Sequence, residues 1–248
     1  MQYLFIAGCG RSGTTALLHI LNVDERIILG EERFKFAMDI LTQDHFKEEH
    51  FFNPSPEETD LPRNPLYARI LYQWLHDKYL RGGVKYIGDK VPRYAYRLLY
   101  LDKMFPGCKI LFLLRDLDAV ASSFNVRAAA TDDPWHPESD YREAIKHWHN
   151  SMIQLRRFVA REDKRRRLFA VQYERFYSGE KAYLEALYRF LDMELPPEII
   201  KEYENITADW EKRKNKPLTL DKSMKEFLDA GKDRELEEFC LSLCPAQA

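Results

Sequence analysis

The chain has 248 residues, of which 45% are hydrophobic and 31% are charged, and its formal net charge is -2. This length and composition are typical of one large globular domain with a substantial core, and the small net charge gives no global attraction to nucleic acid or to an anionic membrane. No apolar run approaches the roughly 18 residues that are needed to span a bilayer, so we expect no membrane-spanning segment.

The cysteines and the N-terminus bear on the cellular compartment. Cys9, Cys108, Cys240 and Cys244 show neither a disulfide framework nor the spacing of a zinc site. The chain starts directly with a strand-like segment and has no signal-type apolar region. Because disulfides are rare in the reducing cytosol, these features predict a cytoplasmic protein with free thiols.

Short apolar runs alternate with longer segments of helical periodicity. Strands are predicted at Tyr3–Gly8, Arg26–Leu29, Lys85–Lys90, Lys109–Asp116 and Arg167–Glu174. Helices are predicted at Thr15–Asn22, Phe34–Leu41, Leu66–Leu80, Tyr96–Phe105, Asp118–Ala130, Tyr141–Glu162 and Lys181–Asp192. This alternation predicts an α/β fold: a P-loop-like three-layer domain with a central, mostly parallel sheet of about five strands flanked by helices.

Three segments fit this alternation poorly. Residues 44–65 are rich in Pro, Glu and Asn and are predicted to form a loop insertion. The charged run Arg161–Arg167 is predicted to be a solvated helix end. Residues 205–248 are polar and lysine-rich with a weak helical pattern, and we expect a closing segment within a single domain that spans residues 1–248.

The stretch GCGRSGTT, from Gly8 to Thr15, lies between the first strand and the first helix. Its glycines allow a tight bend that turns backbone N–H groups inward, and the helix presents the positive end of its dipole at the same place. Hydroxyl donors are added by Ser12, Thr14 and Thr15. These features predict an anion site.

This loop departs from the P-loop template G-x-x-x-x-G-K-[ST], because Thr14 stands at the lysine position. Arg11 supplies the positive charge instead, as a rigid bidentate fork. The strongest strand ends in Arg115 and not in a carboxylate that would hold magnesium. The pattern therefore predicts an anionic ligand that is bound without a metal.

A second anion site is predicted where Arg115 follows a buried strand, because the carboxyl ends of strands line the ligand crevice of open α/β sheets. Ser122 and Ser123 lie two helical turns further on. From the residues alone, an Arg115 that pairs with Asp116 or Asp118 is an equally good interpretation.

The segments GRSGTT and LFLLRDLDAVASSF together resemble the sulfotransferases that use 3'-phosphoadenosine-5'-phosphosulfate (PAPS). GDKVPRY is similar to an element of their bacterial and glycan-type members, and the resemblance runs from Tyr3 to about Tyr177. It implies that Arg115 and Ser123 hold the 3'-phosphate of PAPS. It also implies that the 5'-phosphosulfate is held by the first loop, through Gly10, Arg11, Ser12, Gly13, Thr14 and Thr15.

Three more cofactor contacts follow from the resemblance. Arg127 matches a nucleotide-contacting arginine of the tyrosylprotein branch, and Tyr173, in VQYERF, matches a nucleotide neighbour. Lys216, or Lys214, is implied to fold over the 3'-phosphate, although the tail is only loosely similar and a mobile basic loop is an equal alternative.

The resemblance also implies a catalytic set of Arg11, Glu31 and Lys90. Glu31 matches the general base of the tyrosylprotein branch, Lys90 is placed to stabilise the leaving phosphate, and Arg11 is placed to hold the sulfate and phosphate oxygens. Glu32 is a second candidate for the base, and His136 is a third, because other branches use histidine. No metal ligands are expected.

We therefore predict an O-sulfotransferase that moves the sulfuryl group of PAPS to a hydroxyl, by in-line and metal-free transfer. The cytoplasmic placement favours a small-molecule or glycan acceptor, although nothing in the sequence selects the acceptor. Two alternatives are a P-loop-type small-molecule kinase that uses ATP and magnesium, and a non-catalytic nucleotide-binding module. The predicted wall of the acceptor pocket includes Phe51, Phe52, Tyr67, Tyr94 and Trp135.

Overall fold

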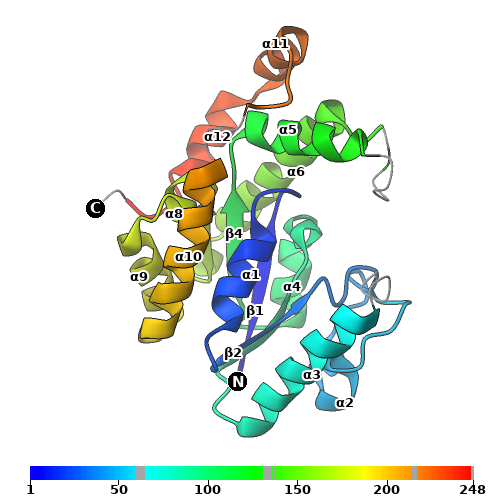
Figure 1. Ribbon diagram of the computed structural model, residues 1–248, viewed down its shortest axis with the longest axis vertical. Coiled ribbons are helices and arrows are strands. Elements are labelled where there is room, and N and C mark those ends of the chain that lie inside the picture. Colours follow the sequence, from blue (N-terminus) through cyan, green and yellow to red (C-terminus); the bar gives the residue numbers. More distant parts are fainter. Residues whose placement is uncertain (60–64, 131–135, 137, 214–216, 247–248) are drawn as a thin grey trace.

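A five-stranded sheet with the order β2-β3-β1-β4-β5 forms the centre of the computed structural model, which describes residues 1–59, 65–130, 136, 138–213 and 217–246 (Figure 1). The strands are β1 (Gln2–Gly8), β2 (Ile27–Glu31), β3 (Tyr86–Lys90), β4 (Lys109–Leu114) and β5 (Leu168–Gln172). Neighbouring strands are parallel in every pairing. The predicted α/β fold with a central parallel sheet is confirmed.

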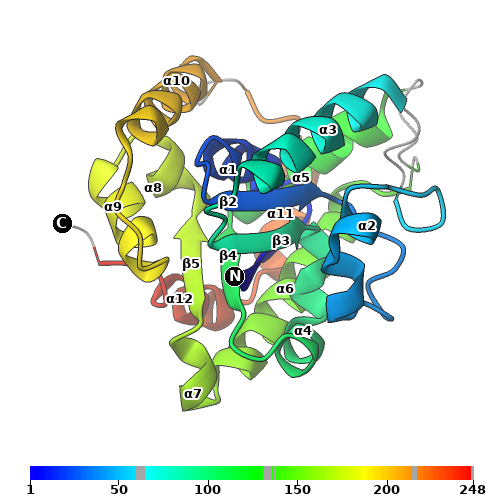
Figure 2. The same ribbon diagram turned by 90° about the horizontal axis from the view of Figure 1, so that it is seen from below.

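Helices cover both faces of the sheet and make three layers (Figures 1 and 2). One face packs against α1 (Thr14–Asn22), α8 (Tyr173–Tyr177), α9 (Lys181–Phe190) and α10 (Pro197–Arg213). The other face packs against α4 (Leu98–Met104), α5 (Leu117–Ala128) and α6 (Tyr141–Val159). Side chains of β1 alternate between these two cores, which explains why its sequence is a continuous apolar run.

The site is positioned by the direction of the strands. Because all strands run the same way, the loop after β1, Glu31 on β2, Lys90 on β3 and the residue after β4 lie at one edge. β1 lies between β3 and β4, so the strand order reverses at its carboxyl end. Ligands bind at such switch points in open α/β sheets.

The predicted helix at Phe34–Leu41 is wrong, because the described backbone forms successive turns there. The buried Asp89 carboxylate accepts hydrogen bonds from the amides of Arg33 and Phe34, each at 3.0 Å. These contacts with β3 hold the chain in turns and override its local helical pattern.

The predicted loop at residues 44–65 is more ordered than its composition indicates. It contains η1 (Gln43–Phe46) and α2 (Glu48–Phe51), and it leads to α3 (Pro65–Arg81). The fully buried Arg33 side chain donates to the carbonyl oxygens of His50, Phe51 and Asn53. Arg33 thus anchors the backbone of a segment that also contributes Phe46, Phe51 and Phe52 to the apolar core.

Other element predictions also need correction. The predicted helix Tyr96–Phe105 is present as the shorter α4, and its first residue, Tyr96, ends the preceding η3 (Pro92–Tyr96). β5 ends before Tyr173, which begins α8. The charged run forms α7 (Glu162–Arg165), where Lys164 is buried against Asp102 and is not solvated.

The weakly patterned C-terminal region is helical where it is described. It forms α10, α11 (Lys222–Gly231) and α12 (Arg234–Leu241), and it adds Leu228, Leu236 and Cys240 to the core. In the part of the chain that the structure describes, no helix is both long and apolar enough to cross a membrane.

Candidate active site at the carboxyl edge of the sheet

The turn between β1 and α1 depends on Gly13. Its φ of 85° lies in the left-handed region, and a Cβ atom there would come within 2.6 Å of the Tyr173 ring. The Tyr177 hydroxyl donates to the Gly13 carbonyl at 2.8 Å and fixes the turn from α8. Only glycine combines this φ with such close aromatic packing.

One buried hydroxyl group in this loop lacks a partner among the described residues. The N-cap residue of α1 is Gly13, which offers no side chain to cap the helix. The Ser12 side chain is fully buried, and its Oγ has no hydrogen-bond partner among the described residues. Because buried hydroxyls are nearly always paired, Ser12 indicates a ligand that supplies the missing partner.

Arg115 lies immediately after β4 and joins the loop to α8. Its guanidinium donates to the Arg11 carbonyl at 2.7 Å and stacks 4.1 Å from the centre of the Tyr173 ring. Its Nε is buried and has no partner in the described structure. Among the described residues no ion pair joins Arg115 to Asp116, which instead caps α5 by accepting from the Ala119 amide.

Arg11 and Ser123 meet although 112 positions separate them. Arg11 Nε donates to Ser123 Oγ at 3.0 Å. Arg127 lies four residues after Ser123 on α5 and so shares its face of the helix. The predicted residues of the second anion site therefore lie beside those of the first.

Ser122 bonds to the C-terminal region, whereas its neighbour Ser123 bonds to Arg11. Its Oγ accepts a hydrogen bond from the Thr219 amide at 2.8 Å, and Asn125 donates to the Thr219 carbonyl at 2.9 Å. These bonds attach the C-terminal region to α5. Lys214, Lys216 and Trp135, which the sequence placed near the site, lie outside the described residues.

Lys90 lies between Thr15 and the two candidate carboxylates, Glu31 and Glu32. It is almost fully buried, and its Nζ donates to Thr15 Oγ1 at 3.0 Å and to Glu32 Oε1 at 3.1 Å. The Glu31 carboxylate is 4.0 Å from the same Nζ. The structure thus brings Glu31 and Lys90 next to Thr15 at the start of α1.

A sequence model of the sulfotransferase family matches residues 3–197. The chain belongs to this family. Among its relatives, a protein-tyrosine sulfotransferase of Drosophila melanogaster is 23% identical over 194 residues, or 78% of this chain and 38% of that protein. Protein-tyrosine sulfotransferase A of Caenorhabditis elegans is 22% identical over 214 residues, or 84% of this chain and 54% of that protein. The chain therefore spans about half or less of the length of these relatives.

Solved sulfotransferase structures show the same fold. The sulfotransferase domain from the curacin biosynthetic pathway has a TM-score of 0.53 and 16% identity, with coverage of 92% of this chain and 96% of that chain. A mouse sulfotransferase complexed with PAP, the desulfated form of PAPS, has a TM-score of 0.53 and 14% identity, with coverage of 97% and 89%.

Two residues that the sequence did not mark as catalytic contact Glu31. The Tyr67 hydroxyl, on α3, donates to Glu31 Oε2. His19 Nε2, on α1, lies 3.8 Å from the same oxygen. The available signal for His19 was its spacing of four residues from Thr15, which puts both on one face of the helix.

Asp89 lies buried beside this cluster, and the sequence predicted no role for it. Its carboxylate is fully buried and accepts from Arg33 N, Phe34 N and the Tyr94 hydroxyl. Burial raises its pKa to about 6 despite these hydrogen bonds. By holding Arg33 and Phe34, Asp89 fixes the chain that follows Glu31 and Glu32.

His136, the third candidate for the base, is more exposed than Glu31 and Glu32. Its side chain is 68% exposed, and its Nδ1 accepts from the Glu138 amide at 3.2 Å. No described contact links His136 to Lys90 or Glu31. Among the three candidates for the base, the described contacts therefore join Glu31 and Glu32, but not His136, to Lys90.

Three side chains away from the strand ends are close enough to hold a metal. Ligand atoms of His45, His50 and Glu58 lie within 4.8 Å of one another. However, the Arg33 guanidinium binds Glu58, and His45 Nδ1 accepts from the Thr42 amide at 3.1 Å. The buried Arg33 guanidinium and this hydrogen bond explain why these three side chains lie together without a metal.

The environment of Glu31 predicts an acid-sensitive contribution to stability. Burial raises its pKa, but His19, Lys90 and Tyr67 together outweigh burial and lower the pKa from 4.5 to about 2. A carboxylate with a lowered pKa stabilises the folded state above pH 4.5, and this contribution is lost as the pH falls towards 2.

We expect the stability of wild type relative to Glu31→Gln to decline by about 3 kcal/mol as the pH falls from 5 to 2. Urea unfolding at several pH values would measure this difference. Glu226→Gln, at a carboxylate that is 68% exposed, is the matched control and should show no such trend. A difference between wild type and Glu31→Gln that stays constant with pH would contradict the proposed environment.

Proposed function

We propose that this chain is a PAPS-dependent O-sulfotransferase. The observation that carries the proposal is the pair of buried, unpartnered donors, Ser12 Oγ and Arg115 Nε, on one connected set of anion-binding residues. Two anionic ends of one ligand would satisfy both donors. PAPS has two such ends, the 5'-phosphosulfate and the 3'-phosphate.

The 5'-phosphosulfate is proposed to lie on the loop after β1. Gly10, Gly13 and the first amides of α1 would line it, and Ser12, Thr14 and Thr15 would supply hydroxyl groups. The 3'-phosphate is proposed to lie between Arg115, Ser123 and Arg11, because Arg11 Nε donates to Ser123 Oγ and the Arg115 guanidinium donates to the Arg11 backbone carbonyl. Tyr173, stacked on Arg115, and Arg127, on the Ser123 face of α5, are proposed to contact the nucleotide.

PAPS supplies an activated sulfuryl group, whose sulfur forms a bond to the acceptor oxygen as its bond to the phosphate oxygen breaks. Glu31 would receive the proton of the acceptor hydroxyl. Lys90, beside Thr15, would stabilise the negative charge that develops on the leaving phosphate oxygen. These cationic and N–H donors perform the electrostatic work that a metal performs in phosphoryl transfer.

Arg11 is proposed to act mainly in binding. Its described side-chain contact is with Ser123 on α5, on the side where the 3'-phosphate would lie. Its carbonyl also accepts from Arg115, so Arg11 couples the two anion sites.

The kinase alternative predicts a lysine in the loop and a carboxylate for magnesium after β4. Thr14 and Arg115 stand at these positions. The non-catalytic alternative predicts that Glu31 and Lys90 tolerate substitution. The acceptor is proposed to be a small molecule or glycan with a hydroxyl group, and the cytoplasmic placement stays a prediction.

Ligand-induced stabilisation tests the proposal. PAP at about 100 times its dissociation constant should stabilise the fold by about 2.7 kcal/mol, which raises the melting temperature by about 5–10 °C for a chain of this size. Mg-ATP should give a much smaller shift. Arg115→Ala should abolish most of the PAP shift, whereas Arg234→Ala, at an arginine that is 66% exposed, should retain it. A large shift with Mg-ATP and none with PAP would refute the proposal.

A further inference from the structure

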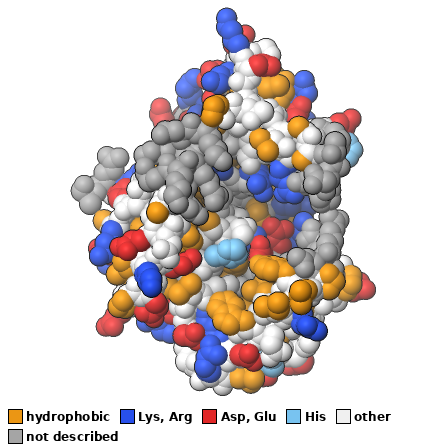
Figure 3. Space-filling model, in the orientation of Figure 1, with side chains coloured by type: hydrophobic (Ala, Val, Ile, Leu, Met, Phe, Trp, Pro, Cys, Tyr) orange, Lys and Arg blue, Asp and Glu red, His pale blue; other side chains and the backbone are white. Residues whose placement is uncertain are grey.

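The residue that follows β2, Glu32, has a left-handed backbone, with a φ of 49°. Side chains along a strand point alternately to opposite faces, so an extended Glu32 would point away from Glu31 and from Lys90, the register partner of Glu31 on β3. The left-handed conformation ends this alternation, and both carboxylates lie near Lys90 Nζ, Glu32 at 3.1 Å and Glu31 at 4.0 Å. They lie at the carboxyl edge of the sheet, where acidic and basic side chains meet in a hollow (Figure 3).

Glu32, and not Glu31, makes the closer contact with Lys90. An ammonium group about 2.8 Å from the Glu31 carboxylate would occupy an oxygen lone pair that must receive the acceptor proton, and it would weaken the base. Because Lys90 donates to Glu32 at 3.1 Å, it stays 4.0 Å from Glu31 and also reaches Thr15. The left-handed turn thus keeps the cation beside the base without pairing the two directly.

Hydrogen bonds hold the backbone of Glu32 on both sides. Its amide donates to the Lys90 carbonyl at 2.8 Å, and its carbonyl accepts from Thr59 Oγ1 at 2.8 Å and from the Lys35 amide at 3.2 Å. A left-handed backbone is costly for a residue that carries a side chain, and it persists where the surrounding structure fixes it. Thr59 brings its hydroxyl to this turn from 27 positions further along the chain.

Thr59 is itself held in place where it meets Glu32. Its side chain is buried, with only 1% of the residue exposed. The carbonyl of the preceding Glu58 accepts from the Phe36 amide at 2.8 Å, and the Glu58 carboxylate binds the buried Arg33 guanidinium. The Thr59 hydroxyl therefore has a fixed position relative to the turn that follows β2.

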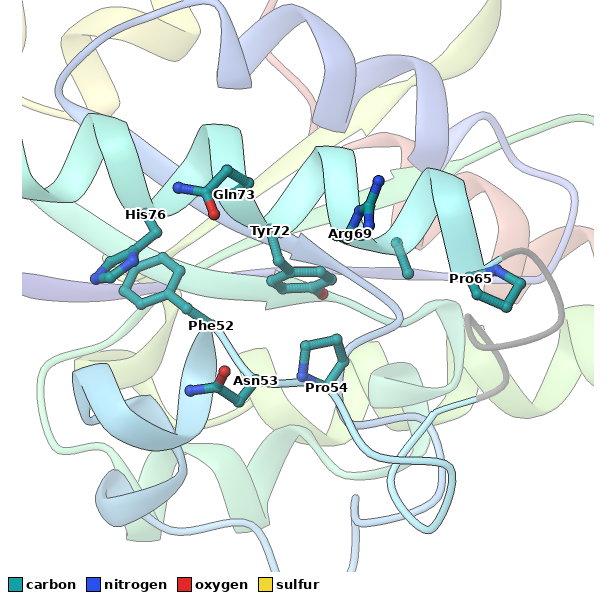
Figure 4. Close-up of a pocket in the computed structure, with 9 residues that line it drawn as sticks. Phe52, Asn53, Pro54, Pro65, Arg69, Tyr72, Gln73 and His76 are labelled. Atoms are coloured by element: carbon teal, nitrogen blue, oxygen red, sulfur yellow. The ribbon is translucent and has the colours of Figure 1, made fainter.

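The segment before Thr59 also lines a cavity. This cavity has a volume of about 440 Å³ and lies between α3 and residues 52–54, with Tyr72 in its centre (Figure 4). None of the described residues that line it belongs to the strand ends or to the loop after β1. The hydroxyl of Thr59, and not this cavity, therefore connects the segment to Glu32.

We propose that Thr59 is a positioning residue for sulfuryl transfer, because its hydroxyl fixes the left-handed backbone of Glu32 and thereby keeps Lys90 from pairing with Glu31. The proposal rests on the sulfotransferase function proposed above and adds a residue to it. Without the hydroxyl, the Glu32 carbonyl loses a partner, and the backbone can return to an extended conformation. Lys90 then pairs directly with Glu31, which weakens the base and draws the ammonium group away from Thr15.

Thr59→Val, which removes the hydroxyl and keeps the branched shape of the side chain, tests the proposal. With PAPS as donor and p-nitrophenol as the acceptor probe, kcat should fall about fivefold, the usual effect of one lost hydrogen bond, while KM for PAPS stays within about twofold and the PAP thermal shift is retained. Thr59→Ser keeps the hydroxyl and should restore most of kcat. Thr207→Val is the matched control, because Thr207 is also buried and its hydroxyl donates to the Glu204 carbonyl on α10, at 3.1 Å.

Crystal structures of wild type and Thr59→Val decide the proposal even if p-nitrophenol is not turned over. In the variant, Lys90 Nζ should approach the Glu31 carboxylate from 4.0 Å to about 2.8 Å. A left-handed Glu32 with an unmoved Lys90 in Thr59→Val overturns the proposal, as does an unchanged kcat or a loss of kcat that Thr59→Ser or Thr207→Val shares. The absence of a PAP shift in wild type refutes the sulfotransferase function instead.

Discussion

Replacing Lys90 with methionine is expected to lower turnover by about 10²–10³-fold while PAP binding changes far less. Lys90 is the buried cation beside Thr15, where the bond to sulfur breaks in the proposed reaction. Its charge matters most in the transition state, when the leaving phosphate oxygen gains negative charge. The loss should therefore appear in kcat and not in KM for PAPS.

Lys35→Met provides the matched control for this variant. Lys35 also pairs with Glu32, at 3.4 Å, but it is partly exposed and contributes no described contact to the loop after β1. Its activity should stay within a few fold of wild type. The proposed role of Lys90 is wrong if both variants lose activity equally, or if Lys90→Met loses only its PAP-induced thermal shift.

Replacing Glu31 with glutamine is expected to reduce kcat by about 10²–10⁴-fold, which is the usual contribution of general base catalysis. The amide keeps the size of the side chain and can still bond to Tyr67, so the fold and the PAP shift should be retained. Burial raises the pKa of Glu31, but His19, Lys90 and Tyr67 together lower it by more. Glu31 is therefore ionised at neutral pH. Single-turnover measurements with PAPS and an alcohol would isolate the chemical step.

Glu32→Gln distinguishes the two neighbouring carboxylates. Glu32 is held between Lys90 and Lys35, whereas Glu31 contacts Tyr67 and His19 and faces α3. We expect Glu32→Gln to lose much less activity than Glu31→Gln. The reverse order would assign the base to Glu32, and full activity in both variants would direct attention to His136.

The sequence predicted the sheet well, and it brought the loop residues and Arg115 with Ser123 together in two short segments, because both depend on local spacing. A buried strand, a glycine-containing turn and a helix place Gly13, Ser12 and Thr15 together within fifteen residues. Arg115 and Ser123 are likewise separated by one strand end and two helical turns. The parallel sheet and the sulfotransferase family are confirmed, and the roles of the individual site residues stay predictions.

The sequence alone did not determine the local structure where contacts between distant segments override a local pattern. Asp89 and Arg33 hold residues 34–41 in turns. Lys164 is buried in an ion pair with Asp102. The C-terminal helices pack on a core that other segments supply. Only the tertiary structure brought His19 and Tyr67 to Glu31. Strand and turn spacing places the residues of the two proposed anion sites. The packing of α1 and α3 against β2 decides what surrounds the candidate base, because those contacts join segments that no local pattern connects.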